Sequence, residues 1–160
     1  MRIIAGDLRG RRLHPPMGLP VRPTTDMARE ALFNILRNRV EFDQVSVLDL
    51  FSGTGAIGFE FVSRGVKHVT SVELNPKCVD FQKRTAEEFG LNNFVALRMD
   101  AFNFLGRSRQ AFDIVFADPP YELKQFDIIP ELVLKSFLKP YGIFVLEHSK
   151  AHDFKSNPYF

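Results

Sequence analysis

The sequence is poor in cysteine and has no tryptophan. Its single cysteine, Cys78, rules out a disulfide within the chain and a zinc site built from several cysteines. No spacing of histidine, cysteine and aspartate predicts a metal site of another kind. We therefore expect no bound metal and a reducing, cytoplasmic setting.

Long apolar runs are also missing. No stretch approaches the roughly 20 apolar residues that span a bilayer, and the N-terminal residues lack the apolar core of a signal peptide. The 160 residues are 45% hydrophobic and 25% charged, which is ordinary for one globular domain with a substantial core. We expect a single structural domain that acts as a monomer and has no membrane partner.

Lysine is absent from residues 1–40, although arginine is frequent there. This segment has eight arginines and three acidic residues, for a net charge of +5, whereas the other 120 residues have 13 basic and 16 acidic residues, for a net charge of −3. A basic arm on a slightly acidic body favours a polyanionic partner. A solvated charged face explains the composition equally well.

Short apolar runs flank a Gly-Asp turn near the N-terminus. Residues 2–5 and 10–14 surround this turn, so we expect a small hairpin whose arginines are displayed for phosphate contacts. A proline-rich connector follows. The sequence Thr-Thr-Asp then provides N-caps for a helix over residues 26–38.

From about residue 45 onward, predicted strands alternate with predicted helices. Short apolar runs predict five strands, at 45–51, 68–73, 94–98, 112–117 and 142–147. The alternation predicts an α/β, Rossmann-like fold with a mostly parallel twisted sheet and helices on both faces. Ligands of such sheets bind at the carboxyl ends of the strands. Four acidic residues stand at those ends: Asp49, Glu73, Asp100 and Asp118.

A glycine loop follows the first predicted strand. Residues 53–58 match G-x-G-x-x-G, a pattern that serves dinucleotides and also S-adenosylmethionine. Asp49, just before the loop, would repel a pyrophosphate but stabilise the cationic end of S-adenosylmethionine. We therefore favour S-adenosylmethionine, with Glu73 accepting the ribose hydroxyls and Asp100 the adenine amino group. A dinucleotide site and a purely structural loop are the alternatives.

The tetrapeptide Asp118-Pro119-Pro120-Tyr121 follows the fourth predicted strand. Its prolines stiffen the backbone and leave carbonyl groups free to accept hydrogen bonds. Such a segment can hold a planar amino group between Asp118 and the Pro119 carbonyl, while Tyr121 stacks on the attached ring. A proline turn that ends the strand is the alternative.

Together these motifs resemble known families. The series D-L-F-S-G-T-G, Glu73, Asp100-Ala101 and D-P-P-Y resembles class I methyltransferases, and D-P-P-Y is similar to the N/D-P-P-Y/F motif of enzymes that methylate exocyclic amino groups of bases. The segments R-I-I-A-G-D-L-R-G-R-R-L, R-P-T-T-D-M-A-R-E-A-L-F-N-I-L and E-H-S from residue 147 resemble the RsmD-type bacterial 16S ribosomal RNA guanine-N2 methyltransferases. This resemblance covers essentially the whole chain.

The resemblance implies methylation of the N2 amino group of a guanine in 16S ribosomal RNA, within the small subunit or an assembly intermediate. It divides the chain into a basic RNA-binding extension over 1–40 and a catalytic domain that binds S-adenosylmethionine over 41–160. The implied catalytic residues are Asp118, Pro119, Pro120 and Tyr121. The implied cofactor-binding residues are Thr25, Asp49, Phe51, Gly53, Gly55, Glu73, Leu74, Asp100 and Ala101, with N-capping as the alternative role of Thr25. The implied RNA-binding residues are Arg2, Arg9, Arg11, Arg12, Arg22 and Arg29.

Two other functions fit the same residues. An adenine-N6 methyltransferase of DNA or RNA would use D-P-P-Y equally well, because that amino group has the same donors. A non-catalytic RNA-binding assembly factor could also retain the fold.

The end of the sequence departs from the class I pattern. In that fold an antiparallel hairpin normally follows the fifth strand, but this sequence ends at Phe160. We expect the hairpin to be shortened or missing, which would leave an uncovered edge strand prone to association.

Overall fold

The sheet is the centre of the molecule. A computed structural model describes residues 1–21, 24–120 and 123–148. Five strands form one sheet in the order β3-β2-β1-β4-β5, and each neighbouring pair is parallel. The strands are β1 (Ser46–Leu50), β2 (His68–Glu73), β3 (Phe94–Arg98), β4 (Phe112–Ala117) and β5 (Leu138–Leu146). The predicted α/β, Rossmann-like fold is confirmed.

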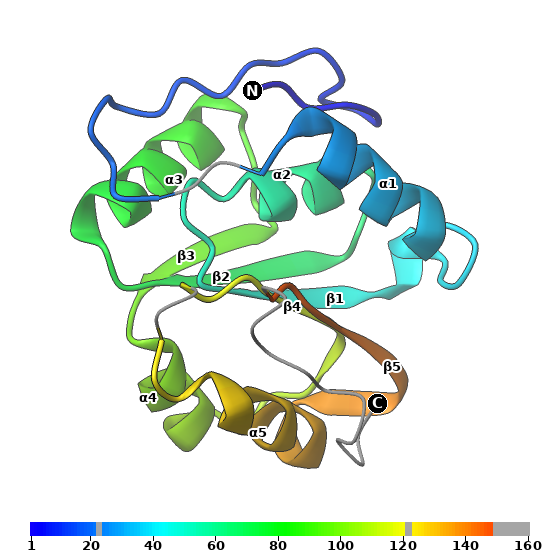
Figure 1. Cartoon of the computed structure of the whole chain (residues 1–160). Helices are drawn as coiled ribbons and strands as arrows, with labels where there is room; N and C mark the ends of the chain where they lie inside the picture. Colours follow the sequence, from blue (N-terminus) through cyan, green and yellow to red (C-terminus); the bar gives the residue numbers. More distant parts are fainter. Residues whose placement is uncertain (22–23, 121–122, 149–160) are drawn as a thin grey trace.

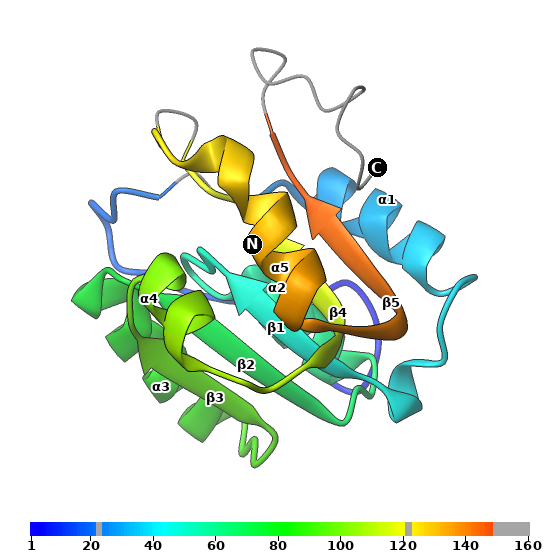
Figure 2. The same cartoon turned by 90° about the horizontal axis from the view of Figure 1, so that it is seen from below.

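Helices cover both faces of this sheet (Figure 1). One layer contains α1 (Asp26–Leu36), α2 (Ala56–Ser63) and α3 (Pro76–Glu88), and the other contains α4 (Ala101–Arg107) and α5 (Ile129–Ser136). Short 3₁₀ turns span Phe42–Gln44 and Phe126–Ile128. The view from below shows α4 and α5 against the second face (Figure 2). Each face has its own apolar core, as the alternation of side chains along a strand requires.

Helix starts follow the capping signals of the sequence. The side chain of Asn75 accepts hydrogen bonds from the backbone of Lys77 (2.9 Å) and Cys78 (3.2 Å), and Pro76 occupies the first helical position of α3. Thr25 caps α1 by accepting from the Ala28 N–H at 3.1 Å. These caps fix where α1 and α3 leave the carboxyl edge of the sheet.

Strand β5 begins four residues earlier than predicted. The sequence Lys-Pro-Tyr-Gly at 139–142 reads as a turn, yet it belongs to β5. Tyr141 has a positive φ of 65°, and the pairing with β4 shifts register between Phe112 and Ile114. A proline and an irregular backbone are tolerated there because β5 lies at the edge of the described sheet.

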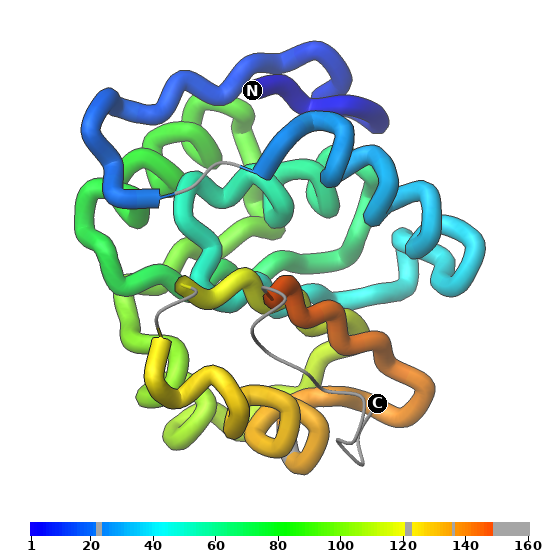
Figure 3. The backbone as a smooth tube through the Cα atoms, viewed as in Figure 1, coloured from blue at the N-terminus to red at the C-terminus, as the bar shows by residue number. Residues whose placement is uncertain are grey.

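The N-terminal arm, residues 1–14, pairs antiparallel with itself through a bridge between Arg2 and Arg12 and through backbone hydrogen bonds that Ile3 and Leu13 donate across the turn. The arm runs across the α2–α3 layer (Figure 3). Two of its apolar side chains, Ile3 and Leu13, are buried in the same core as Phe33 of α1. The extension therefore shares its core with the sheet.

Two remaining expectations concern the C-terminal hairpin and membrane-spanning helices. The predicted loss of the C-terminal hairpin falls on residues 149–160, which lie outside the described residues. Among the helices of residues 1–21, 24–120 and 123–148, none is both long and apolar enough to cross a membrane.

Candidate functional site

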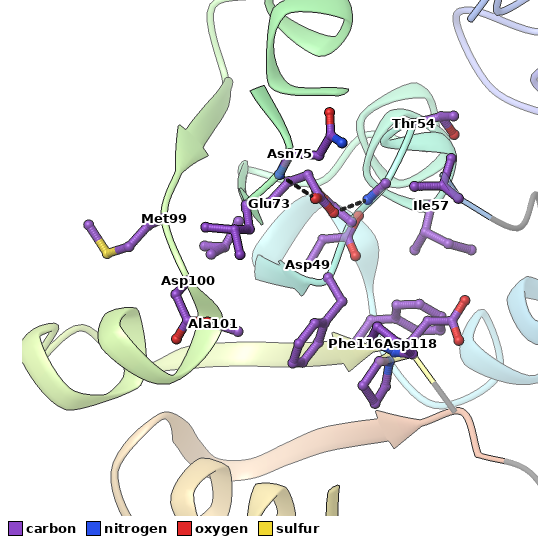
Figure 4. A pocket seen from close by; sticks show the side chains of 18 of the residues that line it. Asp49, Thr54, Ile57, Glu73, Asn75, Met99, Asp100, Ala101, Phe116 and Asp118 are labelled. Carbon is purple, nitrogen blue, oxygen red and sulfur yellow. Dashed lines mark hydrogen bonds between the residues drawn. The ribbon is translucent and has the colours of Figure 1, made fainter. Parts of the chain in front are cut away.

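A cavity of about 740 Å³ opens at the carboxyl ends of the strands. Ligand cavities of proteins generally fall in this size range. Asp49, Glu73, Asp100 and Asp118 all line it, from the ends of four different strands (Figure 4). Its wall includes ten of the predicted site residues: Asp49, Phe51, Gly53, Glu73, Leu74, Asp100, Ala101, Asp118, Pro119 and Pro120.

The glycine loop has the shape that its glycines permit. Gly53 and Gly55 have positive φ angles of 58° and 81°. A Cβ on Gly55 would lie 3.0 Å from the Gln82 side chain, and one on Gly58 would lie 3.0 Å from the Phe94 ring. Gly55 caps α2 and is not among the residues that line the cavity. Its positive φ gives it a conformational role, and its contact with the cofactor stays a prediction.

Glu73 joins the two loops that border the cavity. Its Oε1 accepts from the Gly53 N–H at 2.9 Å, and its Oε2 accepts from the Asn75 N–H at 2.8 Å (Figure 4). Each carboxylate oxygen has a second lone pair. Glu73 can therefore hold the loops and still accept hydroxyl groups of a ligand.

Asp49 is a buried carboxyl group with an orphaned oxygen. The side chain is 1% exposed, and Oδ2 has no hydrogen-bond partner among the described residues. Burial raises the pKa of Asp49 well above its ordinary value; a hydrogen bond from Gly58 opposes this, and the nearby carboxylates of Asp118 and Glu73 raise it further. This environment fits a ligand that carries positive charge, as S-adenosylmethionine does, and does not fit a pyrophosphate.

Asp100 lines the cavity from the end of β3. It caps α4 by accepting from the Asn103 N–H at 3.0 Å through Oδ1, which leaves Oδ2 available to a ligand. Phe51 lines the same wall with a positive φ of 55°, and its ring meets that of Phe102 edge-on at 6.2 Å. This apolar patch beside Asp100 suits a flat heterocycle.

A buried amide, which the sequence did not single out, braces the glycine loop. Gln82 of α3 is fully buried and donates from Nε2 to Ser52 Oγ (2.9 Å) and to the Gly53 carbonyl (2.7 Å). Ser71 Oγ lies 2.6 Å from both Gln82 Oε1 and Ser52 Oγ. A glutamine on the apolar face of a predicted helix was the available signal, because buried amides need partners.

Asp118, Pro119 and Pro120 follow β4 and line the cavity. Figure 4 shows Asp118 beside Phe116, which also lines it. Pro119 is buried and Pro120 is exposed. The acid of this motif thus shares one cavity with Asp49 and Glu73. Tyr121, the last residue of the predicted motif, lies outside the described residues.

Thr25 takes the alternative role, as the cap of α1. Its neighbour Thr24 lines the cavity instead, together with Pro20 and Val21 of the connector. The N-terminal extension therefore supplies part of the cavity wall.

Arg29 was expected to bind RNA, and this prediction is wrong. Its side chain is fully buried, and it pairs with Glu60 at 3.2 Å and with Asp26. It also donates to the carbonyl of Arg2 at 2.8 Å. A buried guanidinium with these partners holds α1, α2 and the arm together and cannot reach a phosphate.

The arginines of the N-terminal arm are placed differently. Arg2, Arg9, Arg11 and Arg12 are exposed, and the Arg11 guanidinium also lies 4.5 Å from the centre of the Phe89 ring. Arg22 lies outside the described residues. Four of the six predicted RNA contacts are therefore available at the surface.

Comparison with known proteins identifies relatives along the whole chain. A family model described as conserved hypothetical protein 95 matches residues 1–159. Ribosomal RNA small subunit methyltransferase D of Haemophilus influenzae is 34% identical over 155 residues, which cover 94% of this chain and 79% of that protein.

Solved structures give the same fold. A hypothetical protein of Thermus thermophilus, TTHA0928, has a TM-score of 0.85 and 30% identity, with 97% of this chain and 90% of that chain covered. An S-adenosylmethionine-dependent methyltransferase of Agrobacterium tumefaciens has a TM-score of 0.64 and 25% identity, with 81% of this chain and 46% of that chain covered.

Proposed function

Since this chain belongs to the RsmD-type family, whose model is described as conserved hypothetical protein 95, we propose that it methylates the exocyclic N2 amino group of a guanine in small-subunit ribosomal RNA. The methyl donor is S-adenosylmethionine. One observation carries the proposal: the orphaned carboxylate of Asp49 and the Asp118-Pro119-Pro120 segment border the same cavity. A cationic donor and a planar amino group would therefore meet there.

The residues of the cavity suit this cofactor group by group. Asp49 would face the cationic end, Glu73 would accept ribose hydroxyls, and Asp100 would accept from the adenine amino group. S-adenosylmethionine, when bound, supplies a methyl group activated by its positively charged sulfur. The chain's main task is then to align an acceptor with that methyl group.

Asp118 and Pro119 act on the acceptor. The lone pair of guanine N2 is delocalised into the ring, so the amino group is a poor nucleophile. Hydrogen bonds from its two N–H groups to the Asp118 carboxylate and the Pro119 carbonyl localise the lone pair and stabilise the positive charge that grows on nitrogen. Asp118 or water would take the proton that the nitrogen loses on gaining the methyl group that S-adenosylmethionine would supply.

The base must leave its stack to reach this site. An amino group in paired or stacked RNA is inaccessible, so the target guanine would be flipped out. Tyr121 would stack on it, and the exposed arm arginines Arg2, Arg9, Arg11 and Arg12, with Arg22, would hold the neighbouring phosphates.

The proposed reaction also has a substrate particle, a compartment and an oligomeric state. The substrate is the small subunit or an assembly intermediate, met in the cytoplasm by a monomer of this chain. Residues 1–40 would bind the RNA through the arm and border the cofactor through Pro20, Val21 and Thr24, and residues 41–160 would carry out methyl transfer.

Labelled methyl transfer tests this function. Small subunits from cells that lack the endogenous enzyme are incubated with the chain and radiolabelled S-adenosylmethionine, and the RNA is digested to nucleosides. We expect N2-methylguanosine at one mapped position. N6-methyladenosine, or no incorporation, would contradict the proposal.

A variant ties the activity to the site. Asp118→Ala should lose methyl transfer by about 100-fold or more, as expected for removal of one group that stabilises transition-state charge. Calorimetry should show that it still binds S-adenosylmethionine. Asp80→Ala, an exposed change on α3, is the matched control and should keep full activity.

A further inference from the structure

The end of β5 lies beside the end of β4. Ala117 pairs with Leu146, and the ladder continues one residue further because the Glu147 N–H donates to the Ala117 carbonyl at 2.9 Å. In Figure 3 the red end of the described chain reaches the yellow segment that follows β4. Glu147 is therefore the neighbour of Asp118 at the carboxyl edge of the sheet.

The alternation of side chains places both acids on one face. Phe116 of β4 and Val145 of β5 are paired and belong to the core under α1, α2 and α3. Ala117 and Leu146 belong to the opposite core. One further step along each strand returns to the first face, so Asp118 and Glu147 both stand on the side of α1–α3.

The carboxylate of Glu147 has no partner among the described residues. It is half-buried, and within the described part of the chain its side chain makes no hydrogen bond or ion pair. By contrast, both oxygens of Glu60 and both of Glu73 accept hydrogen bonds. Glu147 is not among the residues that line the cofactor cavity, although its neighbour Asp118 is.

The motif around Asp118 does not itself distinguish guanine from adenine. Each base offers an amino group with two N–H donors. The difference lies at the adjacent ring nitrogen N1, which carries a hydrogen in guanine and a lone pair in adenine. A carboxylate beside Asp118 would accept the guanine N1–H and repel the adenine lone pair.

We propose that Glu147 is the residue that selects guanine, by accepting N1–H of the flipped base while Asp118 and Pro119 hold its amino group. This inference rests on the proposed methyl transfer. Asp118, which follows β4, then serves methyl transfer, and Glu147, which follows β5, recognises the base. Adenine is then disfavoured because its N1 lone pair would face the Glu147 carboxylate, and both groups are hydrogen-bond acceptors.

The base analogue 2-aminopurine isolates this contact. It keeps the amino group on C2 but lacks both the hydrogen on N1 and the oxygen on C6, so the comparison with Glu147 variants assigns the preference to N1. The mapped target position is prepared with either base, in the RNA or particle that the wild-type chain accepts, and kcat/KM is measured for both. The wild-type chain should prefer guanine by about 10- to 100-fold, the range of one good base contact.

Glu147→Gln should bring this preference close to one. Its amide can donate to the bare N1 of 2-aminopurine, so the rate on the analogue should rise while the rate on guanine falls. Glu147→Ala should lower only the guanine rate. Glu131→Gln makes the same chemical change on the exposed face of α5 and should keep the wild-type preference.

The outcomes separate the two proposals. A Glu147→Gln chain that keeps the wild-type preference overturns the role of Glu147, even if its overall rate falls, because a general structural loss affects both bases alike. A wild-type chain that methylates neither base overturns the proposed function and this inference with it.

Discussion

Asp49 is an acidic residue in an environment that disfavours its charged form. Its carboxyl group is buried, one oxygen has no partner among the described residues, and two further acids stand nearby. Ionising such a group inside a protein is unfavourable unless an opposite charge is present. We interpret the position as stabilised by the cofactor, which supplies that charge.

Asp49→Asn should therefore separate stability from cofactor binding. Removal of the ionisable group should raise the free energy of unfolding of the free chain at pH 7, because the folded state no longer has to ionise a buried carboxyl group or keep it protonated. The same change should weaken S-adenosylmethionine binding. Thermal melts with and without S-adenosylmethionine measure both effects, and a variant less stable than wild type at pH 7 would contradict this account.

The difference in stability between Asp49→Asn and the wild-type chain should depend on pH. The pKa of Asp49 is raised in the folded state, so the folded chain binds more protons than the unfolded chain above the ordinary value of 3.8. Wild-type stability should fall as pH rises from 3.8 through the raised folded pKa. The advantage of Asp49→Asn should be small below pH 3.8 and grow across this window.

Asp113 provides a control, because its pKa is shifted in the direction opposite to that of Asp49. Burial raises its pKa, but hydrogen bonds from the Ser46 N–H and hydroxyl, together with Lys139, outweigh this and leave the pKa lowered. Its contribution to stability is present above pH 3.8 and is lost as pH falls through the lowered value. Asp113→Asn should therefore destabilise the chain at pH 7, where Asp49→Asn stabilises it.

At the scale of elements, the bounds of most strands were easier to predict than the position of a strand in the sheet. The bounds of β2, β3 and β4 match the prediction, because each apolar run ends at a polar or turn-forming residue. The start of β5 was missed because Pro140 and Gly142 resemble a turn, and only the edge position of the strand permits them. Sequence alone does not reveal which strand lies at an edge.

The site was predictable where the fold itself gathers residues. Parallel strands end at one edge, so acids at their ends had to lie close together. Gln82 was missed because its partners come from distant loops. Arg29 was misassigned because composition cannot tell an exposed arginine from one that is neutralised by Glu60 in the core.

The N-terminal arm is held on α2 by specific backbone contacts. Glu60 accepts from the N–H groups of Ile4 (2.9 Å) and Ala5 (3.2 Å), and the Ser63 carbonyl accepts from Asp7 at 2.8 Å. Gly6 lies so close to α2 that a Cβ there would be 1.9 Å from the Ser63 carbonyl oxygen. The arm is thus presented on a fixed support.

Gly6→Ala should detach the arm, whereas Gly10→Ala should not. Both glycines have positive φ, 88° and 82°, so both variants carry the same backbone strain, but a Cβ on Gly10 meets nothing within 4 Å. Gly6→Ala should lose about 1–3 kcal/mol more in the free energy of unfolding, as expected for overpacking. Hydrogen exchange of the Asp7 amide should accelerate only in Gly6→Ala. Equal losses in the two variants would show that the contact with Ser63 is unimportant.

On the scale of the whole molecule, charge and architecture are segregated. The first 40 residues carry a net charge of +5 on a body of −3. The arm that carries the exposed arginines runs over the α2–α3 layer, while α4 and α5 cover the other face (Figure 1). Phosphate binding should therefore belong to one face, with the substrate base directed to the strand ends.

The double variant Arg9→Ala/Arg12→Ala tests whether this placement matters. Each lost phosphate contact should weaken RNA binding and reduce the slope of log K against log salt by about 0.7 for single-stranded RNA. Arg107→Ala/Arg109→Ala removes the same charge from exposed positions at the end of α4, on the opposite face. If binding followed net charge alone, both double variants would lose affinity equally. We expect a shallower salt slope only for the arm variant, measured by titration of small-subunit RNA over a range of salt concentrations, because a phosphate contact requires a guanidinium at the right surface.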